Sequence, residues 1–209
     1  MKLPNPALLV ITDRRQARTS IGDIVLAACA AGCRWFSVRE KDLTAQEQVA
    51  LAESLLPILR RFGARLTLHG EAELAATAGL DGVHLAAGGD TARARALLGS
   101  ARLVGISVHD VAEAAKLDPA LVDYAIAGPA YATASKAEYG PQLGPSGIAA
   151  IASAAPVPIL AVGGISADSA RHMLENRAAG IAVMGAVMRS SVPGEEIRRL
   201  IAALAAPVR

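Results

Sequence analysis

Aromatic residues are scarce in this sequence: one tryptophan, three tyrosines and two phenylalanines account for 3% of 209 residues. Apolar residues nevertheless make up 53% of the chain. The hydrophobic core must therefore be built mainly from alanine, leucine, valine and isoleucine. The length is sufficient for one domain with a sizeable core, and α/β barrels often have about this size or more.

Long hydrophobic runs and single-sign charge clusters are also missing. No apolar run approaches the ~18–20 residues that span a bilayer, and residues 1–6 lack the apolar core of a signal peptide. The formal net charge is +2, and the basic residues form no stripe with interleaved aromatics. We therefore expect a cytoplasmic protein with neither a membrane nor a nucleic acid as partner.

Cysteine is limited to Cys29 and Cys33, one turn apart on an expected buried helix. A disulfide between them is not expected, and no further cysteine is available for a zinc site. We expect both thiols to pack as small hydrophobic groups.

Eight short apolar runs alternate with helical stretches along the whole chain. Such alternation predicts a parallel sheet, and eight repeats without a reversal favour a closed (β/α)₈ barrel in a single domain, residues 1–209. A doubly wound sheet is the structural alternative. The expected strands are 8–12, 35–39, 65–69, 82–85, 103–108, 124–128, 159–162 and 180–184. The expected helices are 21–32, 44–61, 71–78, 90–98, 111–117, 146–154, one beginning after Ser166, and 195–205.

Glycines follow the last two expected strands, namely Gly163, Gly164 and Gly185. Without a β-carbon, they leave backbone N–H groups open to the close approach of a phosphate. The last two strands of a (β/α)₈ barrel frequently form such a phosphate cup. The alternative is that these glycines only allow tight turns.

Polar residues gather at the expected C-terminal strand ends, where the active sites of (β/α)₈ barrels lie. Arg39 and Lys41 alternate with Glu40, so both can face the mouth; the alternative is a surface loop held by salt bridges. Thr133 and Lys136 lie in the longest loop, the kind of segment that often carries function; the alternative is a solvated loop.

Three histidines, His69, His84 and His109, lie at or near the ends of neighbouring strands. Imidazole can transfer a proton near neutral pH or bind a metal ion. A three-histidine metal site is the less favoured hypothesis because no carboxylate at ligand spacing accompanies them. For His84, we favour a hydrogen bond within the barrel.

The chain resembles the thiamine phosphate synthase/TenI family over nearly its whole length. The matching segments, in order, are VITDR (10–14), VREKDL (38–43), ELAATAGLDGVHL (73–85), VGISVH (104–109), GPAYATASK (128–136), LGPSGI (143–148), PILAVGGIS (158–166) and AAGIAVMGAV (178–187). The family fold is a (β/α)₈ barrel, in agreement with the pattern of strands and helices.

The resemblance implies one of two reactions on a thiazole phosphate. The synthase joins a pyrimidine methyl diphosphate to a thiazole phosphate with Mg²⁺, whereas TenI members include a tautomerase that moves a proton on a thiazole carboxylate phosphate. The implied phosphate cup comprises Gly163, Gly164, Met184 and Gly185. Arg39, Lys41, Thr133 and Lys136 match further substrate-binding positions, and Ser107 and His109 match the motif of the fifth strand.

The chain departs from the synthase pattern where Mg²⁺ binds. His69-Gly70 replaces the family's Asn-Asp, residues 86–89 read Ala-Ala-Gly-Gly instead of Gly-Gln-Glu-Asp, and Ser37 replaces a glutamine that contacts the pyrimidine. If the chain is a synthase, Glu71 and Asp90 would have to hold the ion, since Mg²⁺ usually takes one or two carboxylates.

We therefore expect a thiazole tautomerase without a cofactor, with His109 as the group that removes and returns the proton and Ser107 beside it. A Mg²⁺-dependent thiamine phosphate synthase is the second hypothesis. A non-catalytic binder of thiazole phosphate and an unrelated phosphosugar reaction are further alternatives, because the fold alone does not fix function. A homo-oligomer is possible.

Overall fold

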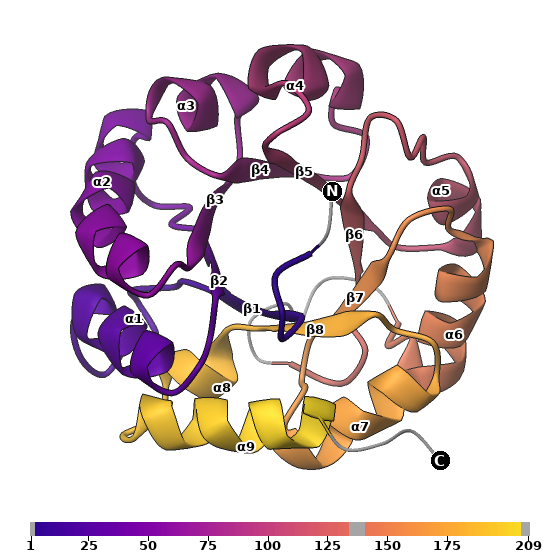
Figure 1. Ribbon diagram of the computed structural model, residues 1–209. Coiled ribbons are helices and arrows are strands. Elements are labelled where there is room, and N and C mark those ends of the chain that lie inside the picture. The colour runs from indigo at the N-terminus through magenta and orange to yellow at the C-terminus, as the bar shows by residue number, and fades with distance from the viewer. Residues whose placement is uncertain (1–2, 134–140, 206–209) are drawn as a thin grey trace.

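The computed structural model describes residues 3–133 and 141–205, and in them eight parallel strands close into a barrel (Figure 1). The strands follow one another around the ring in chain order, and the last pairs with the first. The predicted (β/α)₈ fold is confirmed, and the doubly wound alternative is excluded because the sheet has no edge.

The strands are short and apolar, and most of their residues are buried. They are β1 (Leu8–Ile11), β2 (Trp35–Val38), β3 (Arg65–His69), β4 (Gly82–Leu85), β5 (Leu103–Val108), β6 (Tyr124–Ala127), β7 (Ile159–Val162) and β8 (Gly180–Val183). All of the pairings around the ring are parallel. Their C-terminal ends therefore meet at one rim.

The helices form an outer ring around the strands (Figure 1). They are α1 (Ile21–Ala30), α2 (Ala45–Arg61), α3 (Ala72–Thr77), α4 (Thr91–Leu98), α5 (Val111–Ala115), α6 (Gly144–Ala154), α7 (Ala167–Glu175), α8 (Gly185–Met188) and α9 (Pro193–Ala205). The predicted caps are present: Thr44 and Glu47 form a capping box, and the side chains of Asp90 and Ser166 cap α4 and α7. The four-residue α8 was not predicted.

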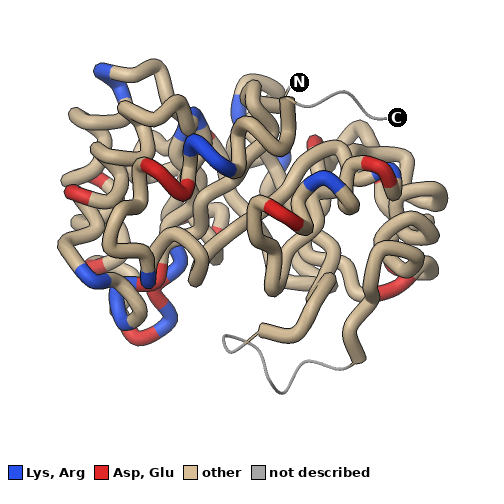
Figure 2. Tube along the Cα trace, turned by 90° about the horizontal axis from the view of Figure 1, so that it is seen from below, with Lys and Arg blue, Asp and Glu red and all other residues tan. Residues whose placement is uncertain are grey.

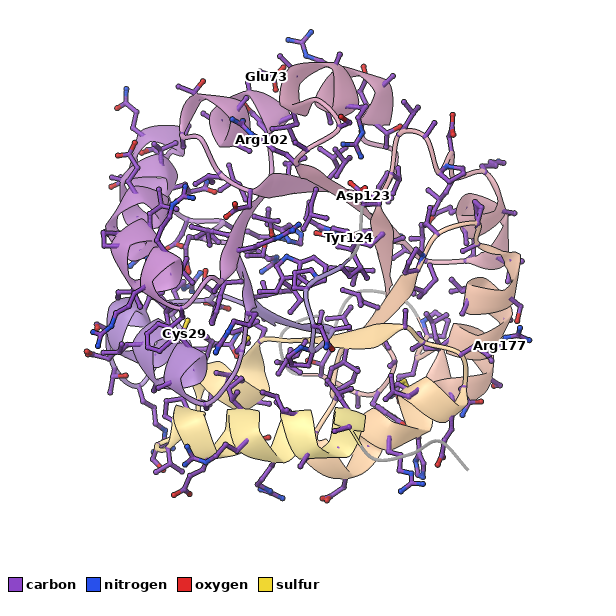
Figure 3. The ribbon with its side chains drawn as sticks, in the orientation of Figure 1. Cys29, Glu73, Arg102, Asp123, Tyr124 and Arg177 are labelled. Carbon is purple, nitrogen blue, oxygen red and sulfur yellow. The ribbon has the colours of Figure 1, made fainter. Side chains whose placement is uncertain are left out.

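Strand side chains divide the core into two layers. Leu9 and Ile11 of β1 belong to a cluster inside the barrel, whereas Leu8 and Val10 pack outside it against the helices. This alternation follows from the period of two residues in a strand. Tyr124 fills the inner layer from β6, and Figure 3 shows it within the ring of strands.

Both cysteines are free and fully buried, as predicted. Burial raises the pKa of Cys29 to about 11 and that of Cys33 to about 12. The two groups therefore stay protonated at neutral pH, and they act as packing groups rather than as thiolate nucleophiles.

Arg95 connects its own helix, α4, with the residues between α4 and β5 and with Asp123, which precedes β6. Its guanidinium lies 2.7 Å from Asp123 Oδ2 and donates to the carbonyls of Gly99 and Arg102, at 2.8 and 2.9 Å. Asp123 also accepts a hydrogen bond from the backbone N–H of Val104, at 2.8 Å. The ion pair is largely buried, with side-chain exposures of 15% and 8%.

We expect Arg95→Ala to lower the free energy of unfolding by about 3–5 kcal/mol, because it removes one partner of a largely buried ion pair. Urea denaturation measures this change. Arg93→Ala is the control on the same helix, since the Arg93–Glu73 pair is exposed and should contribute little. Equal losses in both variants would contradict a special role for the buried pair.

Charged residues of both signs are interspersed over the trace in the view of Figure 2 rather than gathered by sign. Within the described ranges, no helix is both long enough and apolar enough to span a membrane.

Candidate active site

Two cavities open among the C-terminal strand ends. The inner cavity, of about 80 Å³, lies beside the ends of β5 to β8 and has largely apolar walls that include Ile11, Ile126 and Val162. The outer cavity, of about 440 Å³, lies beside the ends of β2 to β5. Four of the described residues line both cavities and thus mark their junction: Arg39, His69, Ser107 and His109.

The structure brings most of the predicted site residues into this region. The inner cavity collects those from β5, β7 and β8 together with one from the long loop and one from β2: Ser107, His109, Gly163, Gly164, Met184, Gly185, Thr133 and Arg39. Lys41 lines the outer cavity. Lys136 lies outside the described residues.

The glycines after β7 have the backbone conformations that suit a close turn. Gly163 and Gly164 have φ values of 100° and 62°, a region that other residues rarely adopt. A β-carbon on Gly164 would overlap the carbonyl oxygen of Ala132. Both steric space and backbone conformation therefore require glycine at this wall of the inner cavity.

His109 follows β5 and is held by Glu113, four residues later in α5. The backbone N–H of His109 donates to Glu113 Oε2 at 2.7 Å, and the same oxygen lies 3.3 Å from His109 Nδ1. Side-chain exposure of His109 is 40%, so the ring remains accessible at the mouth. A carboxylate on Nδ1 leaves Nε2 as the nitrogen that can exchange a proton with a ligand.

Beneath His109, a buried histidine supports Ser107. His84 Nε2 lies 3.0 Å from Ser107 Oγ, and the His84 side chain is fully buried. The predicted hydrogen bond of His84 within the barrel is therefore present. The ring of His69 packs on His84 with their centroids 4.4 Å apart. His84 thus positions Ser107, a residue that lines both cavities.

Glu40 fixes the loop that carries the two predicted cations. Its carboxylate is 2% exposed and accepts the backbone N–H of Arg14 on both oxygens, at 3.2 and 3.0 Å. The backbone N–H of Arg39 donates to Thr12 Oγ1 at 3.1 Å. From this anchored loop, Arg39 extends across the mouth until its Nη1 lies 4.0 Å from Met184 Sδ, after β8.

The donor set does not suit Mg²⁺, which takes oxygen ligands and usually one or two carboxylates. Among the described residues, Glu40 is the one acidic residue that lines the outer cavity, and both of its oxygens already accept hydrogen bonds. Asp90 caps α4 by accepting the N–H of Arg93 at 2.9 Å, and Glu71 lines neither cavity. In residues 3–133 and 141–205, no cluster of three potential ligands is placed for a metal ion.

Several contributors were not predicted from the sequence. Glu113 could have been found, because its four-residue spacing from His109 at the start of a helix is a recognisable signal. The clamp by Glu40 on Arg14 joins residues 26 positions apart, and no local pattern indicates it. Gln48, which lines the outer cavity, was also missed.

The C-terminal rim of the closed barrel collects a histidine–glutamate pair, two basic side chains and a glycine turn. This arrangement is typical of (β/α)₈-barrel enzymes that act on small, charged substrates. The comparisons specify this class further. The family model described as thiamine monophosphate synthase (TMP-TENI) matches residues 8–187. The chain belongs to this family of thiamine biosynthesis.

Relatives and solved structures agree with this assignment. A Geobacter sulfurreducens protein is 40% identical over 200 residues, which cover 95% of this chain and 94% of the relative. The thiamine-phosphate synthase of Chlorobium luteolum is 38% identical over 201 residues, covering 95% and 92%. Thiamine phosphate pyrophosphorylase from Pyrococcus furiosus superposes with a TM-score of 0.83 at 26% identity, covering 94% of each chain.

Proposed function

We propose that the protein is a thiazole tautomerase that acts on a thiazole carboxylate phosphate. The observation that carries this proposal is the His109–Glu113 pair at the rim of a cavity that also contains the glycine turn of β7. A tautomerisation moves one proton between two positions of the ring as a double bond shifts, and it consumes no second substrate. One histidine that removes and returns the proton can perform it.

The remaining residues orient the substrate. The backbone around Gly163, Gly164 and Gly185 holds the phosphate, and the apolar walls enclose the ring. Arg39 suits the ring carboxylate because a guanidinium binds a carboxylate with two parallel hydrogen bonds. Binding energy from the phosphate, remote from the reacting carbons, places the ring against His109.

A Mg²⁺-dependent thiamine phosphate synthase is the second candidate. It is favoured by the names of relatives such as that of Chlorobium luteolum and by an outer cavity of about 440 Å³ beside the inner one, since the synthase reaction needs room for a second substrate. Against it stands the donor set described above. Glu71 and Asp90 would both have to turn toward the outer cavity to supply carboxylate ligands.

We expect the isomerisation of thiazole carboxylate phosphate to proceed at the same rate with EDTA as with Mg²⁺, because no step of the proposed reaction needs a cation. NMR of the two thiazole tautomers measures the rate. A parallel reaction with thiazole phosphate, pyrimidine methyl diphosphate and Mg²⁺ is the test of the second candidate.

The outcomes separate the candidate functions. EDTA-resistant isomerisation supports the tautomerase. Condensation that requires Mg²⁺, without isomerisation, would replace it with the synthase. Tight binding of the thiazole phosphate with neither reaction would identify a binder.

A further inference from the structure

Arg189 contacts the glycine that begins α8. A β-carbon built on Gly185 would lie 2.5 Å from Nη2 and 2.6 Å from Cζ of Arg189. The guanidinium therefore occupies the space that a side chain at position 185 would take. Gly185 lines the inner cavity, whereas Arg189 itself lines neither cavity. The positive charge of Arg189 therefore lies directly behind a residue of the cavity wall.

Helix geometry explains how a residue at the end of α8 reaches the beginning of that helix. Side chains in an α-helix lean toward its N-terminus, and residues four apart lie on the same face. Arg189 is the C-cap residue, and its backbone N–H donates to the carbonyl of Gly185. Its side chain folds back over the same glycine.

The loop between β1 and α1 holds the guanidinium in place. Arg189 Nη1 donates to Oε1 of Gln16, whose own Nε2 donates to Asp13 Oδ2 at 2.5 Å. The backbone N–H of Arg18 donates to the carbonyl of Met188, at 3.2 Å. This loop is therefore attached to α8 at two points, one through side chains and one through the backbone.

No carboxylate among the described residues neutralises the charge of Arg189. In the part of the chain that the structure describes, its side chain bonds to the neutral amide of Gln16 and forms no ion pair with a carboxylate. Arg189 is exposed, so several of its five N–H donors face solvent. A guanidinium with spare donors next to a ligand cavity is suited to a phosphate.

We propose that Arg189 is a phosphate-binding residue of the inner cavity, which closes on the phosphate from the side of α8 while the glycine turn of β7 holds it from the other side. Arg39 reaches Met184 from β2, so two guanidinium groups would flank the end of β8. This inference rests on the phosphate position in the proposed function. It adds a side-chain cation to a cup otherwise made of backbone N–H groups.

The test compares Arg189→Gln with wild type by isothermal titration against three probes: thiazole phosphate, the same thiazole without its phosphate, and inorganic phosphate. We expect Arg189→Gln to weaken the two phosphate-bearing probes about tenfold, as hydrogen bonds to charged groups imply. The unphosphorylated thiazole should bind unchanged. Arg189→Lys, which keeps the charge but loses the planar fork, should give an intermediate affinity.

Arg198→Gln is the matched control, because Arg198 is an exposed arginine whose guanidinium lies beside Gly194 of α9, a glycine that lines neither cavity, rather than beside Gly185. It should leave all three affinities unchanged. In the enzyme assay, Arg189→Gln should raise KM and leave kcat close to wild type, as expected for binding that is uniform between ground and transition state.

Each outcome is decisive. Unchanged affinity for thiazole phosphate in Arg189→Gln, or an equal loss for the unphosphorylated thiazole, overturns the inference. Wild-type protein that binds none of the phosphate-bearing probes overturns it as well. If wild type binds phosphate, Arg189→Gln weakens that binding, and no isomerisation occurs, then the proposed function fails while the role of Arg189 stands.

Discussion

Replacing His109 with alanine should lower the tautomerase rate about 10²–10⁴-fold, the range that general acid–base catalysis usually contributes. In the proposed reaction, the imidazole is the group that both removes and returns the proton. Affinity for thiazole phosphate should change little, because the variant leaves the glycines after β7 and β8, the proposed phosphate site, untouched. Single-turnover kinetics and titration with thiazole phosphate measure the two effects separately.

The partial exposure of His109 makes this variant informative. Its side chain is 40% exposed, so its removal should leave folding intact. His172→Ala is the control, since His172 is exposed on α7 and contacts neither cavity. Full activity in His109→Ala would mean that another group, with Ser107 as the nearest candidate at the junction of the cavities, moves the proton.

Glu113→Gln tests whether the orientation of the His109 imidazole, and not only its presence, contributes to the rate. The amide keeps an oxygen for the backbone N–H of His109 but loses the negative charge that faces Nδ1 at 3.3 Å. We therefore expect a smaller loss of rate than in His109→Ala, because the imidazole is still present but no longer faces the carboxylate that orients it. A rate equal to that of wild type would show that Glu113 only holds the backbone N–H of His109.

Local sequence patterns predicted the barrel because strand and helix signals are short-range. Thr44 with Glu47 and Asp90 before α4 fixed two helix starts to the residue. The starts of α6 and α9 were each predicted two residues too late: both helices carry proline in the first turn, at positions 145 and 193, where its fixed φ suits a helix start. The four residues of α8 are too few to show a helical period.

The site was predictable to the extent that it lies at strand ends. The barrel rule alone placed Ser107, His109 and the glycines at one rim, and the inner cavity collects them. What the sequence could not indicate is which side chains cross the mouth. Arg39 meets Met184 across 145 residues, and Arg189 meets Gln16 across 173. These contacts depend on closure of the ring, which no local pattern encodes.

Closure of the ring also explains a second large effect that we expect, a loss of stability when Gly105 is replaced. Gly105→Ala should lower the free energy of unfolding by about 3 kcal/mol, at the upper end of what overpacking a core costs. Gly105 pairs with Tyr124 in the sheet, and a β-carbon on Gly105 would lie 2.5 Å from both Cε1 and the hydroxyl oxygen of that tyrosine. Urea denaturation of the purified variant measures the loss.

The tyrosine ring has no room to move away. Tyr124 is fully buried, edge-on to Trp35 with centroids 4.7 Å apart, and its ring centroid is 5.6 Å from that of His84. The added methyl group must therefore displace β5 itself. Since β5 carries Ser107 and leads into His109, we expect the folded fraction of Gly105→Ala to lose activity as well as stability.

A double-mutant cycle identifies the cause of the loss. Tyr124→Ala removes the ring and is itself costly, by about 3–5 kcal/mol, but in that background Gly105→Ala should cost much less than in wild type. Gly22→Ala in α1 is the control, because the nearest atom to its β-carbon would be 3.7 Å away and alanine favours a helix. Additive losses in the cycle would show that contact with the Tyr124 ring is not what confines position 105 to glycine. Contacts other than this one would then hold β5, and with it Ser107 and His109, in place.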